Sequence, residues 1–356
     1  MRQKLTLLQA RQWATQAVVV GNGSHLSRGL VEKFGVSRVT AAKALKNLVA
    51  EGWLESTGGT KPTYRLGRNR QVVKTYPLPG IDEHMAWEHD FRPAFDLPRN
   101  VSGIAHHGFT EMVNNANDHS EGASVTAIME IREGRLAILV VDDGIGIFEK
   151  ISKAIGLPDR RLAMLELSKG KFTTDPRNHS GEGIFFTSRM FDQFQVDAND
   201  LHYEHDVRDK HDWLMEIDRP ATGTLVYMAI PVDSQRTAKE IFDAYSGGDD
   251  YGFHKTVVPV RLARVGNENL VSRSQAKRLV ARFEGFKTVI LDFKDVEEIG
   301  QAFADEIFRV FRNSHPEVEL VEIHASADVQ QMINRATASH KALRHEVESG
   351  SRTNEN

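Results

Sequence analysis

The sequence predicts a multidomain α+β protein, and three observations lead to this fold class. Its 356 residues are too many for one ordinary hydrophobic core and suit two or three domains. The hydrophobic share of 40% and the charged share of 26% are typical of globular proteins. Residues 1–80 hold 13 Lys/Arg and 3 Asp/Glu, a net charge of +10, whereas the remainder carries −14. This segregation indicates either a polyanion partner at one end or simply a solvated basic surface.

Several function classes are excluded by what the sequence lacks. The absence of cysteine rules out disulfides, thiolate metal sites and cysteine nucleophiles. No apolar run approaches the roughly 20 residues that span a bilayer, and the first residues lack a signal-peptide pattern. We therefore expect a cytoplasmic protein with no membrane partner.

Residues 1–75 have the pattern of a small DNA-binding fold. Residues 28–34 read as a short helix that stops at Gly35, and Ser37 can cap a second helix. A 3–4 spacing gives the second helix a buried face of Ala42, Leu45, Leu48 and Val49. Residues 53–55 and 63–66 alternate like two strands of a hairpin. Helix, turn, helix and hairpin predict a winged helix-turn-helix domain.

The run GVSRVTAAKAL at 35–45, followed by EGWL at 51–54, resembles the GntR-type winged helix. In such folds the second helix enters the major groove of double-stranded DNA. The resemblance implies four DNA contacts, namely Arg38, Thr40, Lys43 and, in the wing, Lys61. Some winged helices contact proteins instead, which remains the alternative.

A linker is expected over residues 76–97, where prolines and scattered charges mark a boundary. Trp87, Phe91 and Phe95 keep a four-residue spacing there, which also fits a short docking helix.

The central region carries three motifs, the first of which is FTEMVNNANDHS at 109–120. Glu111 and Asn115 are four residues apart and share one face of a helix. The amide oxygen of Asn115 can ligate Mg²⁺, and the carboxylate of Glu111 can orient or deprotonate a nucleophile. Taken alone, this pattern is better explained by an exposed polar helix face.

The second motif is an apolar run at 136–141 followed by DDGIGI, and the third is SGEGI at 180–184. A carboxylate after a strand can accept a hydrogen bond from the adenine amine, and glycines at a helix start expose amides to phosphate. The polar, basic segment 167–175 has the composition of a mobile lid. A later strand begins at Gly223-Thr224.

Together, the order and spacing of these motifs resemble the GHKL superfamily of ATPases and kinases over residues 98–232. The resemblance implies an α/β sandwich that binds ATP and Mg²⁺. It assigns Mg²⁺ to Asn115, adenine to Asp142, the adenine end to Thr224 and catalysis to Glu111. The remaining ATP-binding positions are Gly144, Gly146, Lys169, Gly181 and Gly183.

The histidines do not favour a histidine kinase or a metal site. Members of the histidine-kinase branch typically lack an acid at the position of Glu111, and no phosphoacceptor helix is evident upstream. His106 and His107 face different sides of a helix and are expected to be structural. We expect His202, His205 and His211 to lie in an exposed acidic loop, since they lack convincing ligand spacing.

A small α/β domain is expected over residues 250–340. Strands are predicted at 256–262, 288–293 and 318–323, and helices at 272–284, 299–313 and 327–338. The run LDFKDVEEIGQAFADE at 291–306 resembles the STAS-like domains of unknown function that follow GHKL modules. Residues 299–302 lack the phosphorylatable serine that the STAS antagonists of anti-sigma factors carry there, and Ser272 is explained as a helix cap. Residues 341–356 are expected to be disordered.

Two functional interpretations follow from these resemblances. The favoured one is a DNA-binding transcriptional regulator that senses or slowly hydrolyses ATP and engages a protein partner through its STAS-like domain. Paired winged helices would suit a homodimer. The alternative is a serine/threonine protein kinase of the anti-sigma-factor type.

Overall fold

The computed structural model describes residues 5–59, 61–173, 180–207, 211–246, 252–266 and 268–338. The chain divides into two compact units. The first comprises Met1–Ile147 with Thr187–Ala238, and the second Phe148–Phe186 with Lys239–Asn356. None of the described helices combines the length and apolarity that a membrane crossing requires.

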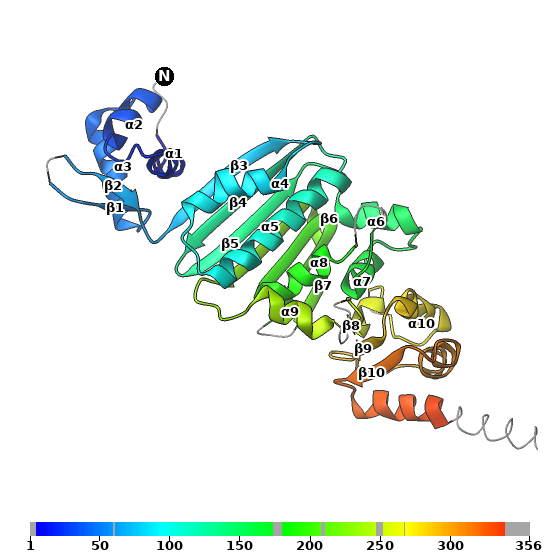
Figure 1. Cartoon of the computed structure of the whole chain (residues 1–356). Coiled ribbons are helices and arrows are strands. Elements are labelled where there is room, and N and C mark those ends of the chain that lie inside the picture. The colour runs from blue at the N-terminus through cyan, green and yellow to red at the C-terminus, as the bar shows by residue number, and fades with distance from the viewer. Residues whose placement is uncertain are drawn as a thin grey trace, which may run out of the picture. The chain divides into compact units, whose positions relative to one another are not determined.

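The first unit begins with three helices and a β-hairpin (Figure 1). Their bounds are α1 Leu7–Val19, α2 Leu26–Phe34, α3 Arg38–Ala50, β1 Leu54–Ser56 and β2 Tyr64–Leu66. Helix α1 was not expected from the sequence, although Thr6 and Gln9 form a capping box at its start. The Trp13 side chain of α1 packs against α2 at Gly29, where an added Cβ would lie 2.2 Å from the indole ring.

Helix α3 begins as expected, because the Ser37 hydroxyl accepts a hydrogen bond from the Thr40 amide at 3.1 Å. Its buried face differs by one position from the prediction. Ala41, Leu45 and Leu48 are fully buried, whereas Ala42 is exposed. Positions 41, 45 and 48 fall within one helical stripe, and residue 42 lies about 100° away from residue 41.

A five-stranded antiparallel sheet forms the centre of the first unit, in the order β3-β4-β5-β7-β6. Its strands are β3 Arg70–Pro77, β4 Ser124–Arg132, β5 Arg135–Asp142, β6 Gln193–Asp206 and β7 His211–Pro231. Burial alternates along β4 and β5, as expected for strands with unlike faces. Helix α5, Arg99–His119, packs across β4, β5 and β7 (Figure 1).

Residues 76–97, expected to be a linker, instead form part of this packing. Strand β3 extends to Pro77 as the edge of the sheet. It is followed by α4 Glu83–Ala86, a π-helical turn at Trp87–Phe91 and a 3-10 turn at Arg92–Ala94. The rings of Trp87 and Phe91 lie 5.5 and 4.8 Å from that of Phe109 on α5. The four-residue spacing of the aromatic residues thus indicated a segment that packs on α5. Burial of these rings stabilises this packing, although the prolines had predicted a linker.

The second unit contains a parallel three-stranded sheet in the order β10-β9-β8. The strands are β8 Lys255–Pro259, β9 Thr288–Asp292 and β10 Glu319–Ile323. Strands β9 and β10 lie at their predicted positions, whereas the strand predicted at 256–262 ends at Pro259 and Val260–Ala263 is a 3-10 helix. The chain's remaining helices include α6 Ile147–Ile155, α7 Leu162–Lys169, α8 Gly183–Met190, α9 Ala238–Tyr245 and α10 Arg273–Val280. Further along the chain, α11 Gln301–Asp305 continues through a π-helical segment at Glu306–Phe311 into α12 Arg312–Ser314. Residues 327–338 are also helical.

Helix α10 is shorter than the predicted 272–284. It begins as expected, since Ser272 and Gln275 form a capping box, which gives Ser272 a structural role. It ends at Val280 because the next residue, Ala281, leaves the helical conformation with φ −54° and ψ 131°, and Arg282 then takes a left-handed conformation with φ +68°.

Candidate functional site

Helix α5 carries the acid and the amide of the first motif one turn apart, and both Glu111 and Asn115 are half-buried. The Nδ2 atom of Asn115 is buried and has no hydrogen-bond partner among the described residues. A buried polar group left without a partner costs about 1–3 kcal/mol. Rotation of the amide exchanges a donor for an acceptor at this position. Asn115 therefore marks a place where a ligand or ion can complete the hydrogen bonding.

Asp142 ends β5 with a buried carboxylate that is held by backbone donors. Its Oδ1 accepts from the amides of Gly144 at 2.9 Å and Thr224 at 3.1 Å. Burial raises the pKa of Asp142, and the hydrogen bonds from Gly144 and Thr224 oppose that shift. Thr224 in turn accepts from the amide of Ile147 at 3.0 Å through its hydroxyl. The structure thus brings together Asp142 and Thr224, which lie 82 residues apart in the sequence.

The neighbouring carboxylate, that of Asp143, stabilises a turn of the protein itself. Asp143 is exposed, and its Oδ1 accepts from the amides of Ala123 at 2.7 Å and Ser124 at 2.9 Å. Its Oδ2 accepts from the Ser124 hydroxyl at 2.8 Å. These hydrogen bonds lower the pKa of Asp143. Of the two adjacent acids, Asp143 fixes the turn before β4, and Asp142 is the one that faces Thr224.

The glycines after Asp142 are required by close approaches within the protein. A Cβ on Gly144 would lie 2.0 Å from the Ser120 carbonyl oxygen. Gly146 has φ +85°, and a Cβ there would lie 2.6 Å from Oδ1 of Asn199. Asn199 also donates to the Ile145 carbonyl at 3.0 Å. Sequence reasoning missed Asn199, because no local signal connects it to a loop 54 residues earlier.

The loop after β5 is tied to the end of α5. The Ile145 amide donates to the Ser120 carbonyl at 2.9 Å, and Ser120 directly follows the helix. Asn115 lies five residues before Ser120, which is about 7.5 Å along a helix axis. The first and second motifs are therefore parts of one local structure.

Lys169 and the glycines of the third motif belong to the second unit. Gly183 begins α8, and Gly181 has φ +72° with its carbonyl accepting from the Phe172 amide at 3.1 Å. Lys169 is the last residue of α7, and its side chain is fully buried. The basic segment 167–175 was expected to lie over a triphosphate, but the structure places Lys169 in the interior. Residues 174 and 175 lie outside the described residues.

The predicted DNA contacts are all exposed. Arg38, Thr40 and Lys43 lie in the first two turns of α3, and Lys61 lies between β1 and β2. Thr40 is 2.9 Å from the Ser37 hydroxyl through its own Oγ1, so its side chain also belongs to the helix cap.

Two of the histidines lie in different surroundings, His107 on α5 and His202 on β6. Burial and the nearby charge of His106 lower the pKa of His107 to about 4, so this ring is neutral near pH 7. His202 lies on β6 and contacts the carboxylate of Asp197. No cluster of three metal-binding side chains occurs among the residues that the structure describes.

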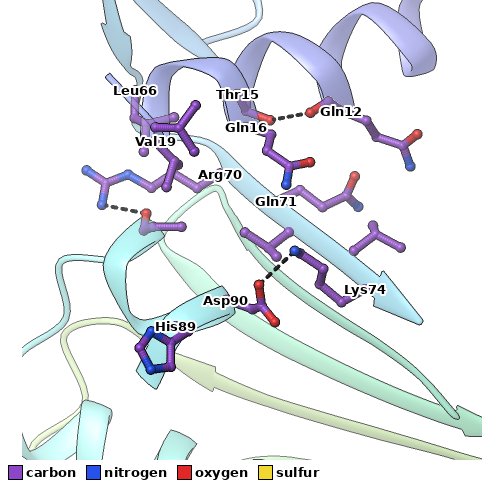
Figure 2. Close-up of a pocket in the computed structure, with 14 residues that line it drawn as sticks. Gln12, Thr15, Gln16, Val19, Leu66, Arg70, Gln71, Lys74, His89 and Asp90 are labelled. Atoms are coloured by element: carbon purple, nitrogen blue, oxygen red, sulfur yellow. Dashed lines mark hydrogen bonds and ion pairs between the residues drawn. The ribbon is translucent and has the colours of Figure 1, made fainter. Parts of the chain in front are cut away.

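A pocket of about 350 Å³ lies between α1, β3 and the segment at 89–94 (Figure 2). None of the predicted site residues lines it. Its lining includes an ion pair between Lys74 and Asp90 at 2.7 Å, and Arg70 donates to the Ala94 carbonyl at 3.3 Å. Because these groups bind one another, we assign no ligand to this pocket.

Comparison with known proteins identifies one part of the chain. A protein-family model described as a STAS-like domain of unknown function matches residues 275–330. The match includes β9, α11 and β10, and most of α10. A search of curated proteins gives no match. The chain thus contains a STAS-like domain in its second unit.

Proposed function

We propose that this chain is an ATP-binding, DNA-binding regulator in which a GHKL-type domain senses or slowly hydrolyses ATP. The observation that carries the proposal is the pairing of Asp142 with Thr224, tied through the Ser120–Ile145 hydrogen bond to the helix of Asn115. It supports a ligand site because the buried Asn115 amide has no partner among the described residues, and backbone donors hold the buried Asp142 carboxylate in place.

The chemistry of Asp142 fits the adenine amine. An ionised carboxylate only accepts hydrogen bonds, and the exocyclic amine of adenine donates them. A donor placed against this buried carboxylate would favour its charged form and offset the cost of burial. Backbone amides of Gly144 and Thr224 already orient Oδ1, so little ordering remains for the ligand to impose.

Asn115 and Glu111 fit the magnesium and phosphate end of the same ligand. The amide oxygen of Asn115 would ligate Mg²⁺, and Glu111 would orient the attacking group. A metal held there would supply charge neutralisation at the phosphate oxygens of bound ATP. The phosphate contacts assigned to Gly181 and Gly183 rest on their motif alone.

The DNA-binding part of the proposal rests on charge and on the exposed face of α3. The net charge of +10 over residues 1–80 would release counterions on binding, so affinity should fall steeply with salt. We expect Arg38→Ala to reduce the salt-dependence slope by about 0.9. Arg28→Ala is the control, since Arg28 is exposed on α2 but pairs with Glu32 at 2.7 Å. Salt-independent binding, or equal losses in both variants, would show that α3 is not the DNA-reading helix.

The decisive experiment follows the terminal phosphate of labelled ATP with the purified chain. Release of free phosphate supports an ATPase, and intact ATP bound to the protein supports a sensor. Glu111→Gln should slow release by about 10²–10⁴-fold without weakening binding. Absence of ATP binding by calorimetry would contradict the proposal.

The alternative is a serine/threonine kinase of anti-sigma type, which the same experiment separates. In that case the label would appear on a hydroxyl of this chain or of a protein partner. We favour the regulator because α11 begins after Gly300 with no side-chain cap, and residues 299–302 offer no hydroxyl for phosphorylation.

A further inference from the structure

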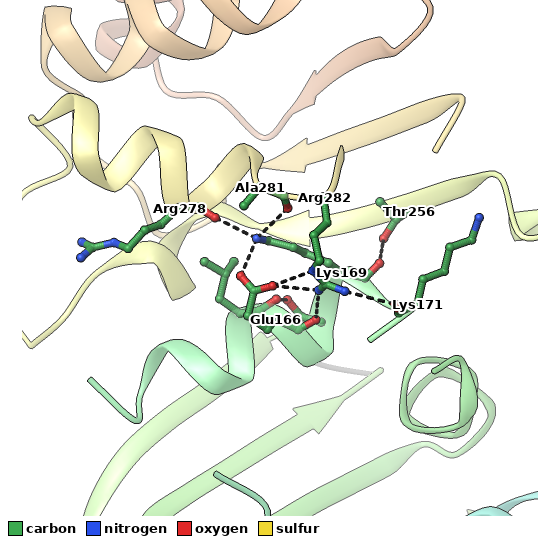
Figure 3. A network of polar contacts seen from close by, with 9 residues as sticks. Glu166, Lys169, Lys171, Thr256, Arg278, Ala281 and Arg282 are labelled. Atoms are coloured by element: carbon green, nitrogen blue, oxygen red, sulfur yellow. Dashed lines mark hydrogen bonds and ion pairs between the residues drawn. The ribbon is translucent and has the colours of Figure 1, made fainter. Parts of the chain in front are cut away.

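Lys169 is the centre of a buried polar cluster in the second unit (Figure 3). Its Nζ donates to Oε1 of Glu166 at 2.7 Å and to the carbonyls of Arg278 at 2.8 Å and Ala281 at 3.1 Å. An ammonium group has three protons, so these acceptors use its full capacity. The two carbonyls lie in the last turn and at the cap of α10, where the helix dipole favours a cation. Lys169 thus joins the end of α7 to the end of α10.

Arg282 makes a second connection between the same elements. Its Nε donates to Oε2 of Glu166 at 2.9 Å, and its Nη2 to the Glu166 carbonyl at 2.9 Å. Its Nη1 donates to the Lys171 carbonyl at 3.2 Å. A non-glycine residue in the left-handed region costs roughly 1–2 kcal/mol, which these bonds offset. The side chain therefore fixes the turn after α10 to residues 166–171.

The same arginine reaches the third sequence motif through one aromatic residue. The guanidinium of Arg282 lies 5.0 Å from the ring centroid of Phe172. The Phe172 amide donates to the Gly181 carbonyl at 3.1 Å. A Cβ on Gly181 would lie 2.4 Å from the Phe172 carbonyl carbon, so the two backbones are in close contact. A shift of Gly181 must therefore displace Phe172 or break this contact.

We propose that Glu166, Lys169 and Arg282 form a latch that couples the Gly181 loop, defined here as residues 180–183, to the STAS-like domain. On the proposed function, on which this inference rests, the Gly181 loop contacts the phosphates of ATP. Nucleotide binding then changes the order of α10 and of residues 281–286 through Phe172 and Arg282. Coupling of this kind is reciprocal, so a ligand of the STAS-like domain would change ATP affinity by the same factor.

The test is hydrogen exchange of the full chain, with and without ATP and Mg²⁺, in the wild type and in Arg282→Gly. Glycine readily adopts the left-handed conformation and removes the whole side chain, the guanidinium included. In the wild type we expect nucleotide to slow exchange about 10-fold both at 181–190 and at 273–286. In Arg282→Gly the protection at 181–190 should remain, while that at 273–286 is lost.

Controls separate the latch from general destabilisation. Arg273→Ala removes an exposed arginine of α10 and should leave both responses as in the wild type. If Arg282→Gly fails to fold, Glu166→Gln weakens the same latch with a smaller change of shape. Nucleotide binding with no response at 273–286, or a response that persists in both latch variants, overturns the coupling alone. Failure to bind nucleotide overturns the proposed function and the coupling with it.

Discussion

The Lys169 ammonium in the second unit and the Asn115 amide in the first differ in how completely the protein satisfies them. Around Lys169 each proton of the ammonium has an acceptor, and Glu166 receives two cations. On α5, near the Asp142 loop, Asn115 Nδ2 has no partner among the described residues. The sequence placed Lys169 and Asp142 in the same ATP site, yet the structure gives them different surroundings.

This contrast distinguishes a structural cluster from a candidate binding site. A fully satisfied network rigidifies the region around it, and removal of one member leaves buried charge behind. A site with an unsatisfied group carries a cost that only a ligand, an ion or a water molecule relieves. Substitutions in the two regions should therefore separate stability from ligand affinity.

The largest effect is expected from Lys169→Met. It leaves the carbonyls of Arg278 and Ala281 without this donor, and loss of one partner from a buried pair costs about 3–5 kcal/mol. All four tryptophans belong to the first unit, so unfolding of the second unit must be followed by hydrogen exchange at 273–286. Lys171→Met is the control, because that ammonium makes an exposed bond to the Gly285 carbonyl. Weakened ATP binding with unchanged stability would restore Lys169 as a phosphate ligand.

A smaller change, now in affinity, is expected from Asp142→Asn. Loss of a charged acceptor for the adenine amine should weaken ATP binding by about 10- to 100-fold in calorimetry. Asp143→Asn is a matched control, since that carboxylate binds the turn at Ala123 and Ser124. Its affinity should stay within about threefold of the wild type. Equal losses in the two variants would remove the distinction between the acids.

The smallest effect is expected from Asn115→Leu, which should raise the free energy of unfolding and not lower it. Replacing the unsatisfied amide with an apolar side chain of similar shape should stabilise the first unit by up to about 1 kcal/mol. The same change should reduce binding of Mg²⁺ and ATP together, and tryptophan fluorescence reports the stability. Asn117→Leu on the same helix should instead destabilise, because its Oδ1 accepts from Gly80 at 2.8 Å and Ile81 at 3.3 Å. Lower stability in Asn115→Leu would show that this amide has a structural partner.

Local patterns predicted much of the secondary structure. The Ser37 and Ser272 caps, the strands at 288–292 and 319–323 and the helix that carries Glu111 and Asn115 all depend on near neighbours. Prediction failed where distant burial decided the outcome. The prolines around residues 76–97 signalled a linker, but aromatic packing on Phe109 made this segment part of the fold.

The sequence by itself determined the candidate motifs, the charge segregation and the STAS-like character of residues 275–330, because residue types and short spacings are local properties. Only the tertiary structure decided that the Thr224 amide holds the Asp142 carboxylate, and that Lys169 is buried against α10. The physical reason is that a side chain's partners depend on segments far away in the chain. Asp142 meets an amide 82 residues later, and Lys169 meets a carbonyl 109 residues later.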